Sequence, residues 1–281
     1  MQRALATHGP TLRVVCASGG NAGLAAACAA QALGVPCTIY LPNGVDARTH
    51  AFLHNVGAEV VAVGRFYLEA LRAAEAAVRT QPNAYVAGSW RLFQYHCSSV
   101  PDLFSGSVLV PAYDHPTLWE GHASMIAEIR TQLPHGVKPA AVFCSVGGGG
   151  LLGGVIEGCR DAGWDDGAPL PSYENPQLRR GGGVVPVVAL ETHGSACFYH
   201  SIAANRAPTN DAPDGVTLRT DDTHGVRVAH VAELKSKATS LGASEPSAGV
   251  VRAALDRAGG VKCVTVPDEA TMQLAGAFAS E

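Results

Sequence analysis

A run of four glycines between two apolar segments is the feature that most constrains how this chain folds. Gly147, Gly148, Gly149 and Gly150 follow residues 140–144, which are typical of a buried parallel strand, and precede residues 151–159, which are typical of a helix. Because glycine has no Cβ, such a turn lets the backbone approach a ligand closely and adopt positive φ angles. Its N–H groups and the positive end of the following helix predict a phosphate site, with a flexible surface turn as the alternative.

Two well-known phosphate loops fit this stretch poorly. A Walker loop requires Gly-Lys-Ser/Thr, and no lysine lies between Lys138 and Lys235. Gly148, Gly150 and Gly153 have the G-x-G-x-x-G spacing of a dinucleotide loop. The acidic residue that should end the next strand, about 20 residues later, comes far too late, because the next predicted strand ends only at Glu191. A nucleotide-dependent oxidoreductase is therefore the weaker hypothesis, and the single phosphate of pyridoxal phosphate is favoured.

A second glycine turn lies near the start of the chain. Residues 12–17 predict a strand, residues 24–33 predict an alanine-rich helix that ends at Gly34, and Ser-Gly-Gly-Asn-Ala-Gly joins the two. One interpretation is that Ser18 or Asn21 caps the helix. The other is that hydroxyl, amide and backbone N–H groups of this turn bind a carboxylate.

The order of the remaining segments predicts an α/β protein with open parallel sheets and helices on both faces. Apolar segments at 37–41, 59–63, 83–87, 184–190 and 262–266 alternate with helical segments, and ligands of such sheets bind at the carboxyl ends of the strands. We also expect a helix over 228–241 and irregular segments at 88–110, 165–183 and 205–226, the last a solvated loop. The predicted domains are a smaller one at 1–120 and a larger one at 121–281.

Composition excludes several classes of partner. A net charge of −4 provides no basic surface for nucleic acid. No apolar run approaches the roughly 18 residues that a membrane span requires. The eight cysteines form no C-x-x-C pair, and the eleven histidines form no metal-binding motif. We therefore expect neither nucleic acid nor a membrane as partner, and a cytoplasmic protein with reduced thiols.

With both turns placed, the sequence resembles the fold-type II pyridoxal-phosphate enzymes, the tryptophan synthase β-like family, and within it the L-serine dehydratase (L-serine ammonia-lyase) branch. Four motifs carry the resemblance, at 18–23, 119–124 (Trp-Glu-Gly-His-Ala-Ser), 145–151 and 191–194 (Glu-Thr-His-Gly). The resemblance implies a two-domain fold, pyridoxal phosphate as cofactor and a homodimer. It also implies conversion of L-serine, with L-threonine as an open second substrate, to a 2-oxo acid and ammonia.

The resemblance further implies roles for individual residues. Asn21 would bond the ring hydroxyl of the cofactor, and Gly147 to Gly150 with Leu151 would hold its phosphate. Ser18, Gly19 and Ala22 would bind the carboxylate of the amino-acid substrate. Glu191 and Ser240 would bind a monovalent cation such as K⁺. For Glu191, a surface charge at the end of a strand is the alternative.

The sequence departs from the family in one respect that bears on catalysis. The family places its Schiff-base lysine in a Ser-x-Lys-x-Arg-Gly motif that here would fall ahead of Met1, and a Glu-Pro-x-Cys-Gly segment that would fall after Glu281. The four lysines present lie elsewhere, at Lys138, Lys235, Lys237 and Lys262. We therefore expect a chain truncated at both ends, without a catalytic residue of its own and with little activity. Two hypotheses stay open: an enzyme complete only in a longer form, and a non-catalytic relative that binds the cofactor or an amino acid and regulates a complete paralogue.

Overall fold

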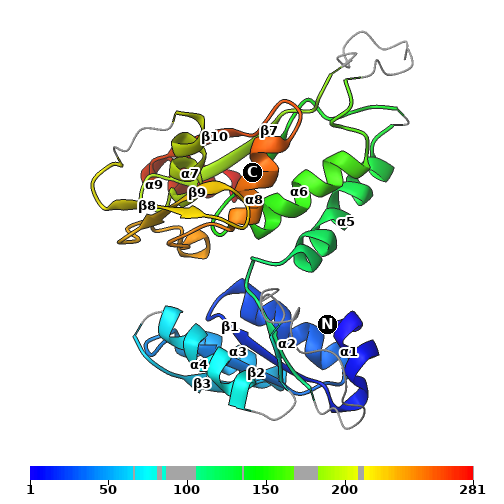
Figure 1. Cartoon of the computed structure of the whole chain (residues 1–281), viewed down its shortest axis with the longest axis vertical. Helices are drawn as coiled ribbons and strands as arrows, with labels where there is room; N and C mark the ends of the chain where they lie inside the picture. The colour runs from blue at the N-terminus through cyan, green and yellow to red at the C-terminus, as the bar shows by residue number, and fades with distance from the viewer. Residues whose placement is uncertain are drawn as a thin grey trace. The chain divides into compact units, whose positions relative to one another are not determined.

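The chain folds into two compact units, seen in a computed structural model (Figure 1) that describes residues 1–65, 67–80, 84–86, 106–134, 136–167, 183–207 and 212–280. The first unit is Met1–Ala112 and the second is Tyr113–Glu281. This division precedes helix α5 (Pro116–Gln132), whereas the boundary predicted at 120 and 121 falls within that helix. Most of the irregular segments predicted at 88–110 and 165–183 lies outside the described residues. The prediction for 88–110 is wrong at its end, because Ser107–Val110 forms a strand, β5, that pairs with the central strand of the first sheet.

The first unit contains a five-stranded parallel sheet with strand order β3-β2-β1-β5-β4. Strand β1 is central, and its side chains alternate between two cores, because successive residues of a strand point to opposite faces. Val14 and Cys16 pack with α2 and α3, whereas Val15 and Ala17 pack with α4. The bounds of these elements are α1 Gln2–His8, η1 Gly9–Thr11, β1 Arg13–Ala17, α2 Asn21–Leu33, β2 Cys37–Leu41, α3 Ala47–Asn55, β3 Glu59–Ala62, α4 Tyr67–Thr80, β4 Ala84–Val86 and β5 Ser107–Val110.

The second unit is built on a three-stranded parallel sheet with strand order β10-β7-β6. Its core gathers Phe198, Leu152 and Ile126, which have no exposed surface, from three different helices. Figure 1 shows α5 beside α6, the two helices that pack most extensively. The further bounds are β6 Val142–Ser145, α6 Gly150–Asp161, β7 Val187–Thr192, α7 Cys197–Arg206, η2 Thr239–Leu241, α8 Ala248–Asp256, β10 Lys262–Val266 and α9 Asp268–Phe278. The prediction of open parallel sheets flanked by helices is confirmed.

The helix predicted at 228–241 is wrong: residues 228–231 belong to an antiparallel hairpin, residues 232–238 are irregular, and residues 239–241 form the short 3-10 helix η2. Strands β8 (Val216–Asp221) and β9 (Val226–Val231) pair across a turn in which Gly225 has a φ of 62°. Val226 and Val228 alternate toward the core and are buried, which stabilises a strand more than a helix at this position. The solvated loop predicted at 205–226 is therefore also corrected in part, since it contains β8, while 208–211 lie outside the described residues.

Local sequence signals explain where several helices begin and end. Gly34 ends α2 in the left-handed conformation with a φ of 66°, as predicted. Asp46 accepts a hydrogen bond from the N–H of Arg48 at 2.9 Å and caps α3. Ser247 likewise caps α8 by accepting from the N–H of Val250 at 3.2 Å.

The cysteines of the described chain form no disulfides, and burial makes some of their thiols unreactive. Every cysteine within the described ranges is a free thiol. Burial raises the pKa of the Cys16 thiol to about 12 and that of Cys144 to about 12, so both are inert small hydrophobic residues.

Among the helices of the described chain, none combines the length and the apolar character needed to cross a membrane.

Candidate functional site

The tetraglycine turn lies at the carboxyl end of β6, directly before α6. Gly149 is the N-cap residue of α6 and has a φ of 95°, a conformation that favours glycine. The N–H of Val146 still belongs to the sheet, since it donates to the carbonyl of Leu190 at 2.8 Å. The predicted strand, glycine turn and helix are therefore all present.

The backbone N–H groups of this turn have no acceptor among the described residues. Within the described chain, no oxygen accepts a hydrogen bond from the N–H of Gly147, Gly148 or Gly149. The first N–H groups of α6, at Gly150 and Leu151, also precede the helical hydrogen-bond ladder. Because the helix end is positive as well, the turn fits a bound phosphate group.

Protein atoms, and not only a ligand, explain why these positions are glycine. A Cβ on Gly148 would lie 2.4 Å from Cγ of Tyr113, and one on Gly150 would lie 2.9 Å from Cβ of Tyr113. A Cβ on Gly147 would lie 3.0 Å from the carbonyl oxygen of Leu241. The sequence argument gave close approach to a ligand as the reason, and the structure adds close packing by Tyr113.

Residues that the sequence interpretation did not select hold the turn in place. The Tyr113 hydroxyl donates to the carbonyl of Glu245 at 3.1 Å, and Trp119 Nε1 donates to the carbonyl of Tyr113 at 2.8 Å. The N–H of Ser247 donates to the carbonyl of Gly148 at 2.9 Å, and its hydroxyl donates to Asp114 at 2.5 Å. The closeness of Tyr113 and Asp114 in sequence to the Trp-Glu-Gly-His motif was the available signal.

The second predicted turn lies in the first unit, at the carboxyl end of the central strand β1. The N-cap of α2 is Gly20, and Ser18 Oγ accepts a hydrogen bond from its N–H at 3.2 Å. The interpretation of Ser18 or Asn21 as the helix cap is therefore wrong. The Asn21 side chain is exposed, and a Cβ on Gly23 would lie 2.2 Å from the carbonyl oxygen of Ser18, so the turn is tight.

The position of this turn suits ligand binding. Gly19 and Ala22 are partly exposed beside Ser18 at the carboxyl edge of a parallel sheet, where ligands of α/β folds bind. The turn at 18–23 belongs to the first unit and the tetraglycine turn to the second.

Glu191, at the end of β7, is buried and not a surface charge. It is 2% exposed, and its Oε1 and Oε2 accept hydrogen bonds from the N–H groups of Phe198 at 3.0 Å and Tyr199 at 2.6 Å. Burial raises the pKa of Glu191 to about 8, and the two hydrogen bonds oppose that rise. The carboxylate thus caps α7.

Ser240, the predicted partner of Glu191 in a cation site, is exposed, whereas Glu191 is buried. Ser240 is exposed on η2, and no interaction within the described chain joins it to Glu191. The described residues contain no group of three or more His, Cys, Asp or Glu side chains able to hold a metal ion. The cation site stays a prediction.

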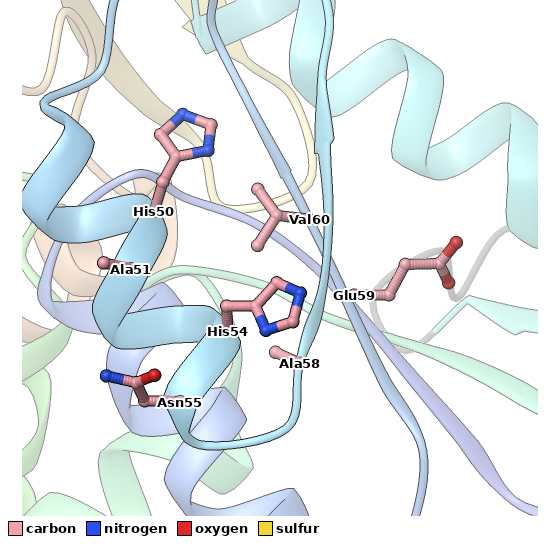
Figure 2. A pocket seen from close by; sticks show the side chains of 7 residues that line it. All are labelled: His50, Ala51, His54, Asn55, Ala58, Glu59 and Val60. Atoms are coloured by element: carbon pink, nitrogen blue, oxygen red, sulfur yellow. The ribbon is translucent and has the colours of Figure 1, made fainter.

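A pocket in the first unit lies away from the ligand edge of its sheet (Figure 2). It is formed by the second half of α3 and the amino end of β3. Figure 2 shows the rings of His50 and His54 on the side of Val60, while the Glu59 carboxylate points away. Glu59 instead accepts a hydrogen bond from Thr38 Oγ1 at 3.0 Å. The residues that line this pocket are His50, Ala51, His54, Asn55, Ala58, Glu59 and Val60.

Parallel α/β units with a glycine turn between a strand and a helix are typical of proteins that bind phosphorylated cofactors. Comparison with known families makes this specific, because the family described as "Pyridoxal-phosphate dependent enzyme" matches residues 1–281. The chain belongs to this family.

Individual relatives place the chain near the serine dehydratase branch, as the sequence motifs predict. It is 36% identical over 195 residues to the L-serine dehydratase/L-threonine deaminase of Mus musculus. The aligned region covers 69% of this chain and 46% of the mouse protein. It is 37% identical over 197 residues to the serine dehydratase-like protein of Homo sapiens, covering 70% and 46% of the two chains. The chain thus spans about half the length of the curated relatives it matches.

A solved structure supports the same fold. The fungal L-serine ammonia-lyase from Rhizomucor miehei superposes with a TM-score of 0.69 and 27% identity, covering 99% of this chain and 67% of that one. The fold is therefore that of the fold-type II pyridoxal-phosphate enzymes.

Proposed function

We propose that this chain carries the binding turns of a pyridoxal-phosphate-dependent lyase that converts L-serine to a 2-oxo acid and ammonia, with L-threonine as the second substrate to test. The observation that carries the proposal is the set of unused N–H groups at Gly147, Gly148 and Gly149, directly before α6. Names of relatives support the reaction class. When bound, the cofactor supplies an electron sink for the substrate Cα.

The proposed division of labour follows the two turns. The N–H groups of the tetraglycine turn and Leu151 hold the cofactor phosphate, and the Asn21 amide bonds the ring hydroxyl. Ser18, Gly19 and Ala22 bind the substrate carboxylate through N–H and hydroxyl groups. The partly exposed positions of these three residues at the carboxyl edge of β1 support this role.

An active enzyme would need a lysine for the Schiff base, and none of the 281 residues has been assigned that role. Lys138 donates to the carbonyl of Asp166 at 3.0 Å, and Lys235 pairs with Glu233 at 3.1 Å, so both amines have partners away from the two glycine turns. We therefore expect binding without efficient turnover from the 281 residues alone. The second candidate function is a non-catalytic relative that binds pyridoxal phosphate or an amino acid and regulates a complete enzyme.

Three further features belong to the same proposal. Glu191 and Ser240 lie on segments that border the second-unit site and are proposed to respond to K⁺. A homodimer is proposed for the complete protein. The free thiols favour a reducing compartment such as the cytoplasm.

Ligand binding and turnover by the purified chain test the proposal. Calorimetry with pyridoxal phosphate should give binding, and NAD should give none. Formation of 2-oxo acid from L-serine should be near background, and should rise in a longer form that carries a lysine ahead of Met1. Absence of cofactor binding would overturn the lyase, and absence of binding of both the cofactor and L-serine would overturn the non-catalytic candidate as well. Rapid turnover by the 281-residue chain would overturn the non-catalytic candidate alone. Replacing KCl by LiCl should lower the melting temperature of the wild type but not of Glu191→Gln if the cation site exists.

A further inference from the structure

Tyr113 lies against the face of the tetraglycine turn that a side chain would otherwise occupy. The ring atoms of Tyr113 lie 2.4–2.5 Å from where a Cβ on Gly148 would be. The Cβ atom of Tyr113 lies 2.9 Å from where a Cβ on Gly150 would be. We propose that Tyr113 is a positioning residue for phosphate recognition, which holds the turn so that its N–H groups stay directed at one phosphoryl group. This inference rests on the proposed function of the turn.

The segment 244–247 supports the turn from a second direction. Its Ser247 N–H donates to the carbonyl of Gly148 at 2.9 Å. Because a trans peptide is planar, its carbonyl and the following N–H point in opposite directions. Fixing the Gly148 carbonyl toward Ser247 therefore directs the N–H of Gly149 away from Ser247, where no described protein atom accepts it.

The Tyr113 hydroxyl links these two supports. It donates to the carbonyl of Glu245 at 3.1 Å, two residues before Ser247. Asp114, the next residue along the chain, accepts from the Ser247 hydroxyl at 2.5 Å. The ring and the hydroxyl of Tyr113 together thus connect the glycine turn to the segment that orients the Gly148 peptide, and rotation of that peptide would break its hydrogen bond with Ser247.

The hairpin adds an outer contact of smaller weight. Arg219 on β8 donates through Nε to the Glu245 carboxylate at 2.9 Å, and 49% of its side chain is exposed. Exposed ion pairs contribute little, because water screens them. Tyr113, whose ring is packed on the turn, is therefore the residue on which phosphate recognition should depend.

A pair of ligands that differ only in the phosphate isolates this role. Pyridoxamine 5′-phosphate and pyridoxamine have the same ring, and neither carries an aldehyde that reacts with surface lysines. Calorimetry on the full chain gives the ratio of their Kd values, which measures phosphate recognition alone. We expect Tyr113→Phe to weaken the phosphorylated ligand about 2- to 10-fold, the range of one hydrogen bond, and to leave pyridoxamine unchanged. Tyr113→Ala, which also removes the ring, should weaken it by more than about 10-fold.

The controls separate this inference from the proposed function and from misfolding. Tyr199→Phe removes a hydroxyl of the same unit that has no partner among the described residues, and it should leave the ratio unchanged. If the wild type does not favour the phosphorylated ligand, the proposed function and this inference both fail. If it does, and Tyr113→Phe retains the wild-type ratio, this inference alone is overturned, even where Tyr113→Ala does not fold.

Discussion

The guanidinium of Arg257 donates to the carboxylate of Asp165 at 2.5 Å, and the pair is almost fully enclosed, with 1% and 12% of the two side chains exposed. Arg257 also donates to the carbonyls of Gly260 at 2.9 Å and Val185 at 2.7 Å. Its Nε is a buried atom without a partner among the described residues. The pair therefore joins the end of α8 to the segments that precede β7.

Removal of the Asp165 carboxylate should destabilise the second unit strongly. Asp165→Ala leaves the buried guanidinium without a counter-charge, which typically costs about 3–5 kcal/mol. Urea unfolding followed by circular dichroism measures this loss. Asp161→Ala is the matched control, because it breaks an Arg160 pair whose two side chains are each 67% exposed, and it should produce no measurable change. Equal stabilities of the two variants would contradict the prediction.

Two glycine-to-alanine substitutions on the packed helices α5 and α6 should have opposite effects. A Cβ on Gly154 would lie 2.3 Å from Cβ of His122 and 2.8 Å from the carbonyl oxygen of Trp119, so α5 and α6 must separate to accept it. Gly154→Ala should therefore destabilise by about 1–3 kcal/mol, despite the better helix propensity of alanine.

Gly121 on α5 provides the comparison, since a Cβ there has no neighbour within 4 Å. Gly121→Ala should stabilise by up to about 1 kcal/mol through reduced backbone entropy of the unfolded chain. Melting temperatures of both variants distinguish the two effects. A Gly154→Ala protein as stable as the wild type would show that α6 does not need a small residue at this contact.

The parts of the fold that were predictable are those that local sequence determines. Gly34 ends α2 and Gly149 begins α6, because each adopts a positive φ that few other residues tolerate. Parallel strands were visible as apolar runs between helices. The hairpin was not, because the burial of Val226 and Val228 depends on contacts with α7, which a single sequence does not reveal.

The candidate site was predictable to a similar depth. The glycines of both turns were found, since their order and flanking segments are local features. The support of the tetraglycine turn by Tyr113 and Ser247 was missed, because it joins residues that are distant in sequence, as in the hydrogen bond from Tyr113 to Glu245 with a separation of 132. The burial of Glu191 was missed for another reason: its partners Phe198 and Tyr199 are only seven and eight positions away, but a carboxylate at the end of a strand is most often exposed.

The hairpin should depend on one buried hydroxyl of α7. Ser201 is fully buried, its Oγ donates to the carbonyl of Cys197 at 2.7 Å, and it accepts from the N–H of Ala229 on β9 at 2.8 Å. Ser201→Ala leaves that N–H buried without its acceptor, which costs about 1–3 kcal/mol. Urea unfolding measures the loss. Ser124→Ala removes an exposed hydroxyl that, among the described residues, bonds only the carbonyl of Gly121 in its own helix, and should be nearly neutral. A similar loss of stability in both variants would argue against docking of the hairpin through Ser201.

The contribution of Asp268 to stability should depend on pH. Asp268 accepts from the N–H of Lys237 at 3.0 Å and from the Ser236 hydroxyl at 2.8 Å, and these bonds lower the pKa of its carboxyl below the ordinary 3.8. Since the folded-state pKa is the lower one, the stabilisation is present above the unfolded value and is lost as the pH falls through the folded value.

The difference in free energy of unfolding between wild type and Asp268→Asn isolates this effect. It should be constant from pH 7 to about pH 5, decrease below about pH 4, and vanish once the folded carboxyl is protonated. Urea unfolding at each pH gives the difference. Glu269→Gln is the control, because Glu269 is the neighbouring acid of the same helix turn and accepts no hydrogen bond within the described chain. The difference in free energy of unfolding between wild type and Glu269→Gln should not show this dependence on pH. A difference for Asp268→Asn that persists unchanged to pH 2 would mean that the two hydrogen bonds do not depend on the charge of the carboxylate.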